Sequence, residues 1–560
     1  MKSNLLCTGV LLALILPVVL LKANQPNVLF IIVDDMNGYA VFDEYANAKT
    51  PHIDAFKQEA VTFTKAYCAV AKCVPSRAAV MSGLPANITG AYLDESKPWQ
   101  NSKILKSCEA LPECFQKNGY YTWGRGKTFH NNPPNGRHGN MWNNKYHGGG
   151  FGPFVTGANQ IQGKWWGVQA YPDKDFPDVY NTDSAVSFLN KTHSEPFFLT
   201  IGLYRPHTPF TAPQRFFDMY NLEDITIPSW YLENDLDDVP QAGRNLIDFN
   251  NHWSTSGIEN EENWKKLIWA YLACNSFVDY NIGRLLTALE DNQLNDNTIV
   301  VVWSDNGYHC GEKNHWEKSL MWEQATNTPL FIKIPGMASA GETYHAPVSL
   351  VDIYPTLVDY CNLQKPKNEL AGISLRPFLE DTELVLDRPI VSFNQRNHIT
   401  IRSYNYRYLQ YPDGSEELYN HLVDSYEHTN LALNLEYKPI IEDMKSWIPK
   451  TMNTYTNTSY EIEQVTYDTL FYSVNSLNAY KKGKIRIYPN PVCDRLYVKT
   501  YNSLIKQIQL TDITGRLVKV ESEKVGANYV SVNLNGVEVG QYLLNIQTKE
   551  FQETKKIIVR

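Results

Sequence analysis

The stretch that decides the fold reads Asn27-Val-Leu-Phe-Ile-Ile-Val-Asp34-Asp35, an apolar run that stops at two carboxylates. Such a run predicts a strand covered on both faces of a sheet. Three later apolar runs also stop at polar residues: 120–123 before Gly-Arg-Gly-Lys127, 196–203 before Arg-Pro-His207, and 298–303 before Asp305-Asn306. Because ligands bind outside the carboxyl ends of parallel strands, the four ends predict one shared site.

Helical patterns lie between these strands and indicate the fold class. Residues 182–190 and 262–291 have apolar residues at helical spacing. Strands alternating with helices predict an α/β domain with a doubly wound, mostly parallel sheet, which we assign to residues 24–380. The stretch between Phe129 and Tyr180 has little periodicity, which is typical of functional loops.

The remainder of the chain has a different pattern. Short alternating strands at 399–402 and 406–411, with a turn at 412–414, predict a smaller antiparallel subdomain over 381–450. Residues 451–480 are rich in Thr, Asn, Ser and Tyr and are interpreted mainly as a linker. Residues 481–560 alternate apolar and polar side chains in short strands, which predicts a terminal β-sandwich.

Composition restricts the function. The chain has 560 residues, 43% of them hydrophobic and 20% charged, as in an ordinary globular protein. Its 51 basic and 60 acidic residues give a net charge of -9, so no global field attracts nucleic acid or an anionic membrane. An anionic substrate would therefore have to be captured by local positive charge.

The N-terminus carries a targeting signal. Lys2 precedes an apolar run from Leu5 to Leu21, which predicts a secretory signal peptide over residues 1–23. A membrane anchor is the weaker alternative, because the run is short for a span and contains Pro17. In an oxidising compartment the remaining cysteines could pair, with Cys108 and Cys114 the closest candidates, although sequence alone does not settle the pairing.

The most informative motif is Cys73-Val-Pro-Ser-Arg77-Ala-Ala-Val-Met-Ser-Gly83. Pro75 near the start and Gly83 past the end are helix boundary signals. They place Cys73 at a helix N-terminus, where free N–H groups favour an anion, so Cys73 is a candidate nucleophile. On this motif alone, a buried structural or disulfide cysteine is an equally good interpretation.

Further motifs give the chain a resemblance to a known family. Cys-x-Pro-Ser-Arg after a strand ending in Asp34-Asp35 resembles the signature of the formylglycine-dependent sulfatases, over roughly residues 27–435. The branch it looks most similar to is the iduronate-2-sulfatase-like one, although Asn306 stands where close relatives often have His. Strings that share the resemblance are Thr-Pro-His-Ile-Asp at 50–54, Gly-Lys-Thr-Phe-His at 126–130, Arg-Pro-His-Thr-Pro-Phe at 205–210, and Glu-Leu-Tyr-Asn at 417–420 with Asn-Leu-Ala at 430–432.

The resemblance implies an alkaline-phosphatase-like fold and a modified nucleophile. In this family the Cys73 position is oxidised to a formylglycine, which is hydrated to a diol. One diol oxygen would attack sulfur and release the alcohol, and the second hydroxyl would then expel sulfate, which is covalent catalysis. This maturation implies a formylglycine-generating enzyme as a partner.

The resemblance also implies a metal site. One Ca²⁺ would be held by Asp34, Asp35, Asp305 and Asn306, together with the modified Cys73. Hard oxygen ligands suit calcium, and several carboxylates this close repel one another unless a cation lies among them. The alternative for Asp34-Asp35 taken alone is a helix or turn cap.

Positive and titratable side chains complete the implied site. Arg77 would hold the hydrated aldehyde, and Lys127 and Lys318 would contact sulfate oxygens. His130 would act as the base that breaks down the sulfated hemiacetal, and His207 would protonate the leaving oxygen. Lys313 and His315 lie close to Lys318 in sequence and could fill an adjacent role. His138, His147 and His309 are further candidates without an assigned role.

The C-terminal module has a resemblance of its own. Ile-Tyr-Pro-Asn-Pro at 487–491, Asp-Ile-Thr-Gly-Arg at 512–516, Gly-Gln-Tyr at 540–542 and the basic end Lys555-Lys556 resemble a type IX secretion sorting domain. The resemblance implies export across the outer membrane by that machinery, after transit through the periplasm, to the cell surface or the medium. A carbohydrate-binding sandwich is the competing interpretation.

Together these features predict a sulfuric ester hydrolase that removes sulfate from a carbohydrate. Oligosaccharides of a sulfated algal polymer such as ulvan, carrageenan or fucoidan are the first expectation, ahead of glycosaminoglycans. Two alternatives are a phosphomonoester or phosphonate hydrolase of the same superfamily and a non-catalytic surface glycan-binding protein. The aromatic residues between Trp142 and Tyr171 could stack on sugar rings or could pack over the sheet.

Overall fold

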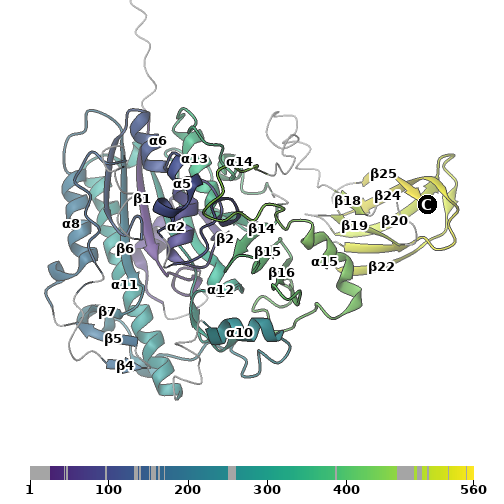
Figure 1. Cartoon of the computed structure of the whole chain (residues 1–560), viewed down its shortest axis with the longest axis horizontal. Coiled ribbons are helices and arrows are strands. Elements are labelled where there is room, and N and C mark those ends of the chain that lie inside the picture. Colours follow the sequence, from purple (N-terminus) through teal and green to yellow (C-terminus); the bar gives the residue numbers. More distant parts are fainter. Residues whose placement is uncertain are drawn as a thin grey trace, which may run out of the picture.

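The fold was analysed in a computed structural model (Figure 1). It describes residues 25–42, 45, 48–94, 97–130, 137, 141–150, 152, 159–161, 164–169, 171–249, 260–384, 388–462, 485–488, 495–500, 504–526, 529–549 and 552–559. The predicted signal peptide lies outside these residues. None of the described helices is long and apolar enough to cross a membrane.

A mostly parallel sheet forms the centre of the α/β domain (Figure 1). Its strand order is β12 (Thr343–Tyr344), β2 (Val61–Tyr67), β11 (Asn327–Lys333), β8 (Thr298–Ser304), β1 (Asn27–Asp34), β6 (Phe197–Pro206) and β3 (Tyr121–Gly126), with β13 (Val348–Ser349) also on β2. The four predicted strands occupy the neighbouring places β8, β1, β6 and β3 and run parallel. The pattern did not reveal β2 or β11, and β11 is antiparallel to both β2 and β8.

Alternation along β1 explains why both faces of the sheet are covered. Val28, Phe30 and Ile32 pack into one core with side chains of α2 (Cys73–Ser82), α6 (Leu111–Lys117) and α13 (Ile353–Tyr360). Leu29, Ile31 and Val33 point to the opposite face and pack with α8 (Pro177–Leu189) and α11 (Glu261–Asp291). The last two helices cover the predicted 182–190, apart from Asn190 at the C-cap, and the predicted 262–291. The doubly wound α/β class is therefore confirmed.

Short elements complete the α/β domain. The helices are α1 (Pro51–Lys57), α3 (Ala86–Thr89), α4 (Pro98–Asn101), α5 (Lys103–Ser107), α9 (Gln214–Phe217), α10 (Gln241–Phe249), α12 (Glu323–Thr326) and α14 (Arg376–Glu380). The 3-10 turns are η1 (Gly38–Ala40), η2 (Asp173–Asp175), η3 (Leu222–Asp224), η5 (Asn295–Asn297), η6 (Glu312–Asn314) and η7 (Leu350–Asp352). Strands β9 (His309–Cys310) and β10 (Trp316–Glu317) form a two-stranded ladder.

Three aromatic side chains from the stretch after Phe129 are packed in the core. Strands β4 (Asn159–Ile161), β5 (Lys164–Gln169) and β7 (Phe210–Pro213) form a small sheet. Trp142 and Tyr146 are buried in the core that contains α2, and Trp166 is buried against α11. Of the two alternatives for these three side chains, the structure therefore favours packing, whereas Tyr171 is 43% exposed.

The antiparallel subdomain is joined to the α/β domain by buried ion pairs. It contains β14 (Ile390–Phe393), β15 (Ile399–Arg402), β16 (Tyr406–Gln410), β17 (Glu416–Asn420), η8 (Leu435–Tyr437) and α15 (Lys438–Lys445). Arg402 and Arg407 both pair with Glu323 of α12. Within the subdomain, the Nε atom of Arg407 also lies 2.5 Å from a carboxylate oxygen of Glu427. Pairs buried in this way disfavour separation of the two parts, because each charge would lose its partner.

The first part of the predicted linker belongs to the folded unit. The Asn453 amide donates to the Asn87 carbonyl at 2.7 Å, and the Lys103 amide donates to the Tyr455 carbonyl at 3.0 Å. Tyr460 and Ile462 also pack against the core. Residues 451–462 are therefore held against the folded unit by these contacts. Residues 463–480 of the predicted linker lie outside the described residues.

The C-terminal module consists of two four-stranded antiparallel sheets. One contains β18 (Ile485–Tyr488), β19 (Arg495–Thr500), β23 (Tyr529–Asn533) and β22 (Glu521–Gly526). The other contains β21 (Leu517–Val518), β20 (Ile505–Asp512), β24 (Gly540–Thr548) and β25 (Gln552–Val559). Side chains from both sheets form one core, as the predicted β-sandwich requires.

The seven cysteines that the structure describes are unpaired. Cys108 and Cys114 are both buried, and their sulfur atoms lie near the carbonyls of Leu105 and Gln364 instead of each other. The structure thus does not form the disulfide that proximity in sequence suggested for this pair.

A close backbone approach between β3 and β6 generates a first prediction. A Cβ atom on Gly202 would lie 2.1 Å from the carbonyl of Lys127. Gly202→Ala should therefore lower the thermal unfolding midpoint, through a destabilisation of roughly 1–3 kcal/mol. Gly150→Ala is the matched control, because a Cβ atom on Gly150 would meet no atom of the described residues within 4 Å, apart from its chain neighbours. Equal midpoints for the two variants would contradict the prediction.

Candidate active site

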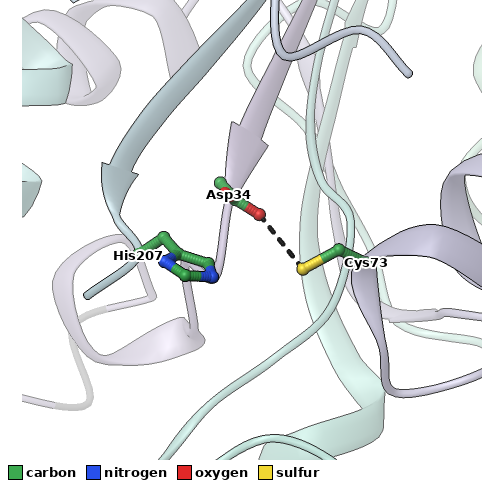
Figure 2. Close-up of side chains that lie close together, drawn as sticks. All are labelled: Asp34, Cys73 and His207. Atoms are coloured by element: carbon green, nitrogen blue, oxygen red, sulfur yellow. Dashed lines mark hydrogen bonds between the residues drawn. The ribbon is translucent and has the colours of Figure 1, made fainter. Parts of the chain in front are cut away.

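The ends of four strands and the start of α2 deliver the candidate residues to one place. β1 ends in Asp34 and is followed by Asp35, β8 is followed by Asp305 and Asn306, β3 by Lys127, and β6 by His207. Cys73 is the first residue of α2. Figure 2 shows Asp34, Cys73 and His207 facing one another, and their ligand atoms lie within 4.8 Å.

Cys73 is a buried thiol that contacts an acidic and a basic side chain of the site. Its Sγ atom donates to Asp34 Oδ1 at 3.4 Å and accepts from Lys318 Nζ at 2.7 Å. Burial, assisted by the negative charge of Asp34, raises the pKa of Cys73 well above its usual value. The unmodified side chain is therefore a neutral thiol near pH 7, which is a poor nucleophile.

The local sequence explains the start and end of α2. Lys72 is extended at the N-cap, Pro75 lies in the first turn, and Gly83 ends the helix with φ 69°. This left-handed conformation is one that glycine adopts without strain. The predicted helix boundaries are therefore those of the structure.

Three carboxylates are buried together around Cys73. Asp34, Asp35 and Asp305 are each at most 1% exposed. Burial raises the pKa of Asp35 to about 7, against the opposing charge of Lys318. Burial acts in the same direction on Asp34, but Lys127 and other nearby cations outweigh it and hold the pKa of Asp34 well below its usual value.

Three cations face the carboxylates. Arg77 Nε donates to Asp305 Oδ2 at 2.6 Å, Lys318 Nζ donates to Asp35 Oδ1 at 2.5 Å, and Lys127 pairs with Asp34. Arg77 also donates to the Lys127 carbonyl. In the described residues the cluster therefore contains equal numbers of acidic and basic side chains, so its desolvated charges are compensated.

The donor set fits a hard divalent cation. Asp34, Asp35, Asp305 and Cys73 each place a ligand atom within 4.8 Å of the others. Asn306 donates through Nδ2 to Asp35 Oδ1 at 2.8 Å, while its buried Oδ1 accepts no hydrogen bond from the described residues. A buried carbonyl oxygen left without a donor is an atom that a cation would satisfy, and oxygen ligands are those that Ca²⁺ and Mg²⁺ prefer.

Two histidines border the cluster. His207 Nε2 lies 3.8 Å from Asp35 Oδ2, and its Nδ1 is 2.6 Å from the Thr208 carbonyl. Burial, together with the charge of Lys318, lowers the pKa of His207 well below its usual value. Burial and Lys127 lower the pKa of His130 to about 3. Both side chains are thus neutral near pH 7, the protonation state that a general base requires.

The other candidates are mostly engaged elsewhere. Lys313 Nζ lies 2.7 Å from Asp235 Oδ1, so it is paired away from the cluster. His315 Nε2 lies 3.1 Å from the Lys318 carbonyl, and this contact helps to position that lysine. His309 is buried beside His315, with ring centroids 5.8 Å apart, and His147 Nδ1 lies 2.7 Å from the Tyr180 hydroxyl. His138 lies outside the described residues.

Some residues that support the site have no sequence signal. Tyr271 of α11 donates to the Asp35 carbonyl at 2.7 Å and accepts from the Asn37 amide at 2.9 Å. These bonds help hold Asp35 at φ 65°, a conformation uncommon for a residue other than glycine. A tyrosine within a helical pattern looks like any core aromatic residue, so only tertiary contact reveals this role.

Comparison with family models agrees with this geometry. Residues 26–363 match the sulfatase family model, and residues 311–454 match the model of the N-sulphoglucosamine sulphohydrolase C-terminal region. Residues 486–560 match the secretion system C-terminal sorting domain. The last match confirms the predicted sorting module.

Curated relatives give the same family. A sulfatase of Formosa agariphila is 38% identical over 476 residues, which cover 80% of this chain and 92% of the relative. Human iduronate 2-sulfatase is 28% identical, over 61% of this chain and 70% of its own length. An ulvan-active sulfatase of Formosa agariphila is 25% identical, over 77% of this chain and 82% of its own length.

Solved structures share the fold. A phosphonate monoester hydrolase of Agrobacterium radiobacter aligns with a TM-score of 0.62 at 21% identity, over 75% of this chain and 94% of its own. A protein in complex with its substrate D-glucosamine-2-N,6-O-disulfate aligns with a TM-score of 0.60 at 21% identity, over 76% and 96%. With the family match over more than half of its length, the chain therefore belongs to the sulfatase family and is an enzyme of that family.

Proposed function

We propose that this sulfatase hydrolyses sulfate esters on a carbohydrate, with Cys73 converted to formylglycine and one Ca²⁺ held by Asp34, Asp35, Asp305 and Asn306. The observation that carries the proposal is the buried cluster in which the Cys73 side chain lies between carboxylates and Lys318. The converted side chain supplies an oxygen nucleophile that a neutral buried thiol does not. A bound cation would supply positive charge to a sulfate oxygen.

The basic side chains bind and stabilise the reacting group. Lys127 and Lys318 are each 4% exposed or less, and both lie beside Cys73 or its Asp34 partner. A cation on the three carboxylates would leave these lysines with surplus positive charge, which an anionic sulfate ester offsets. Buried cations already in place stabilise charge that develops on sulfate oxygens without reorganisation.

The histidines move protons. His207 is proposed to protonate the leaving sugar oxygen, because an alkoxide is too basic to depart unassisted. Its pKa is low in the structure, and the negative charge of a bound sulfate ester would shift that pKa upwards. His130 is proposed as the base in the second half of the reaction, which its neutral state suits.

The substrate class is inferred from the relatives. The ulvan-active relative supports a sulfated algal polysaccharide fragment as the substrate, with glycosaminoglycan fragments as the alternative. The structural likeness to a phosphonate monoester hydrolase makes phosphoryl esters the competing chemistry. A surface glycan-binding protein without catalysis is the third alternative.

The sorting domain supports export. We infer that the chain carries a signal peptide, transits the periplasm and reaches the cell surface or the medium through type IX secretion machinery. A formylglycine-generating enzyme is the partner required for maturation of Cys73. An exported sulfatase would act on polymers too large to enter the cell.

Conversion of Cys73 is the first test. Protein made with a formylglycine-generating enzyme should show the aldehyde mass in the Cys73 peptide, and its release of sulfate from an aryl sulfate should follow the converted fraction. Cys73→Ala should be inactive, whereas Cys68→Ala, which alters another buried thiol, should keep turnover. Full activity with an unmodified thiol, or faster release of phosphate than sulfate from matched aryl esters, would falsify the proposal.

Metal removal is the second test. A chelator should reduce sulfate release about tenfold or more, and it should also lower the thermal unfolding midpoint, because the ion stabilises the folded state that binds it. Added Ca²⁺ should restore both quantities. Asp305→Asn should lose the calcium-dependent rise in the midpoint. An unfolding midpoint of the native enzyme that changes with neither chelator nor added Ca²⁺ would argue against a bound ion.

The role of His207 is the third test. His207→Gln should reduce kcat for a sugar sulfate by about 10²–10⁴-fold, the usual worth of general acid catalysis. For a nitrophenyl sulfate the loss should be under about tenfold, because that leaving group departs without a proton. Equal losses for the two substrates would assign His207 to binding instead.

A further inference from the structure

The β14–β15 hairpin of the antiparallel subdomain reaches the catalytic cluster. Its turn, residues 394–398, begins at Asn394, which is fully buried. Lys72 Nζ donates to the Asn394 carbonyl at 2.8 Å, and Asn394 Nδ2 donates to the Ser319 carbonyl. Lys72 precedes Cys73, the proposed nucleophile position, and Ser319 follows Lys318, which is proposed to contact sulfate. One asparagine thus fixes the turn against both segments.

Backbone pairing holds the hairpin in this position. Val70 and Phe393 form a parallel bridge, and the Phe393 amide donates to the Ala69 carbonyl at 2.9 Å. Ser392 Oγ donates to the Cys68 carbonyl at 2.6 Å. The segment that precedes α2 therefore runs beside the end of β14. The turn cannot move away from the cluster without breaking these hydrogen bonds.

The tip of the turn presents a cation. Arg396 and Asn397 are exposed, while Gln395 and His398 are partly buried. Arg396 follows Asn394 by two residues, so their Cα atoms are at most about 7 Å apart. In the part of the chain that the structure describes, no carboxylate forms an ion pair with Arg396.

A buried tyrosine packs beside the base of the turn. Tyr92 packs edge-on against Phe393, and its buried hydroxyl makes no hydrogen bond to the described residues. Burial raises the pKa of Tyr92, and the positive charge of Arg396 opposes the rise.

We propose that Arg396, on the turn 394–398, forms a subsite for a second acidic group of the substrate. The ligand chemistry is a carboxylate or a sulfate ester on the sugar next to the one that carries the scissile sulfate. A planar guanidinium binds both groups through paired hydrogen bonds. The inference rests on the proposed carbohydrate sulfatase function and adds a residue that selects polyanionic over neutral substrates.

The test compares substrates that differ in one group. Three disaccharides carry the same scissile sulfate, with a second sugar that is neutral, carries a carboxylate or carries a sulfate. Arg396→Ala should raise KM about tenfold for one or both acidic disaccharides with kcat retained, and Arg396→Lys should recover part of the loss. The neutral disaccharide and nitrophenyl sulfate should be hydrolysed as by wild type. The acidic disaccharide whose KM rises more shows whether the subsite binds a carboxylate or a sulfate ester.

Lys438→Ala is the matched control, because it removes an exposed cation from the same subdomain at the start of α15. Equal effects of Arg396→Ala on all three disaccharides, or no effect on either acidic one, would overturn the subsite. If wild type hydrolyses nitrophenyl sulfate but none of the disaccharides, their inhibition of that reaction gives the same comparison. If formylglycine-loaded wild type lacks sulfatase activity, the proposed function fails, and calorimetric binding of the three disaccharides still decides the subsite.

Discussion

Compensation of buried charge is the constraint on which the rest of this structure depends. Asp34, Asp35 and Asp305 are withdrawn from water at one edge of the sheet, where isolated carboxylates would be costly. Arg77, Lys127 and Lys318 offset that cost through direct ion pairs. Each partner comes from a different segment, so the cluster forms only when β1, β3, β8, α2 and the loop after β10 are all in place. The arrangement of the candidate catalytic residues therefore depends on the complete tertiary structure.

The sequence was most informative where function and local structure coincide. The run ending at Asp34-Asp35 predicted a covered strand, and strand β1 is buried along its whole length. Pro75 and Gly83 located the helix that begins at Cys73. In both cases the signal is local: an apolar run for the strand, a fixed φ and a left-handed terminus for the helix.

Long-range contacts were beyond sequence reasoning. Strands β2 and β11 were missed: they pair with each other across more than two hundred residues of sequence, although β11 also pairs with the nearby strand β8. Asn453 lies in a polar stretch that looked like a linker, yet its amide bonds to Asn87. The Tyr271 hydroxyl under Asp35 and Asn394 beside Ser319 follow the same rule. The residue types predicted the charged and nucleophilic groups of the site. The residues that hold those groups in place could be found only from the packing of the folded chain.

The depth of Cys73 has a consequence for the order of events in biogenesis. Its side chain is 1% exposed and lies beneath strand ends that assemble from distant parts of the chain. Under the proposed conversion, a modifying enzyme would reach Cys73 only before the sheet closes. The converted fraction would then depend on the rate of modification relative to the rate of folding. Any change that speeds closure of the sheet would yield more molecules that are well folded yet catalytically inert.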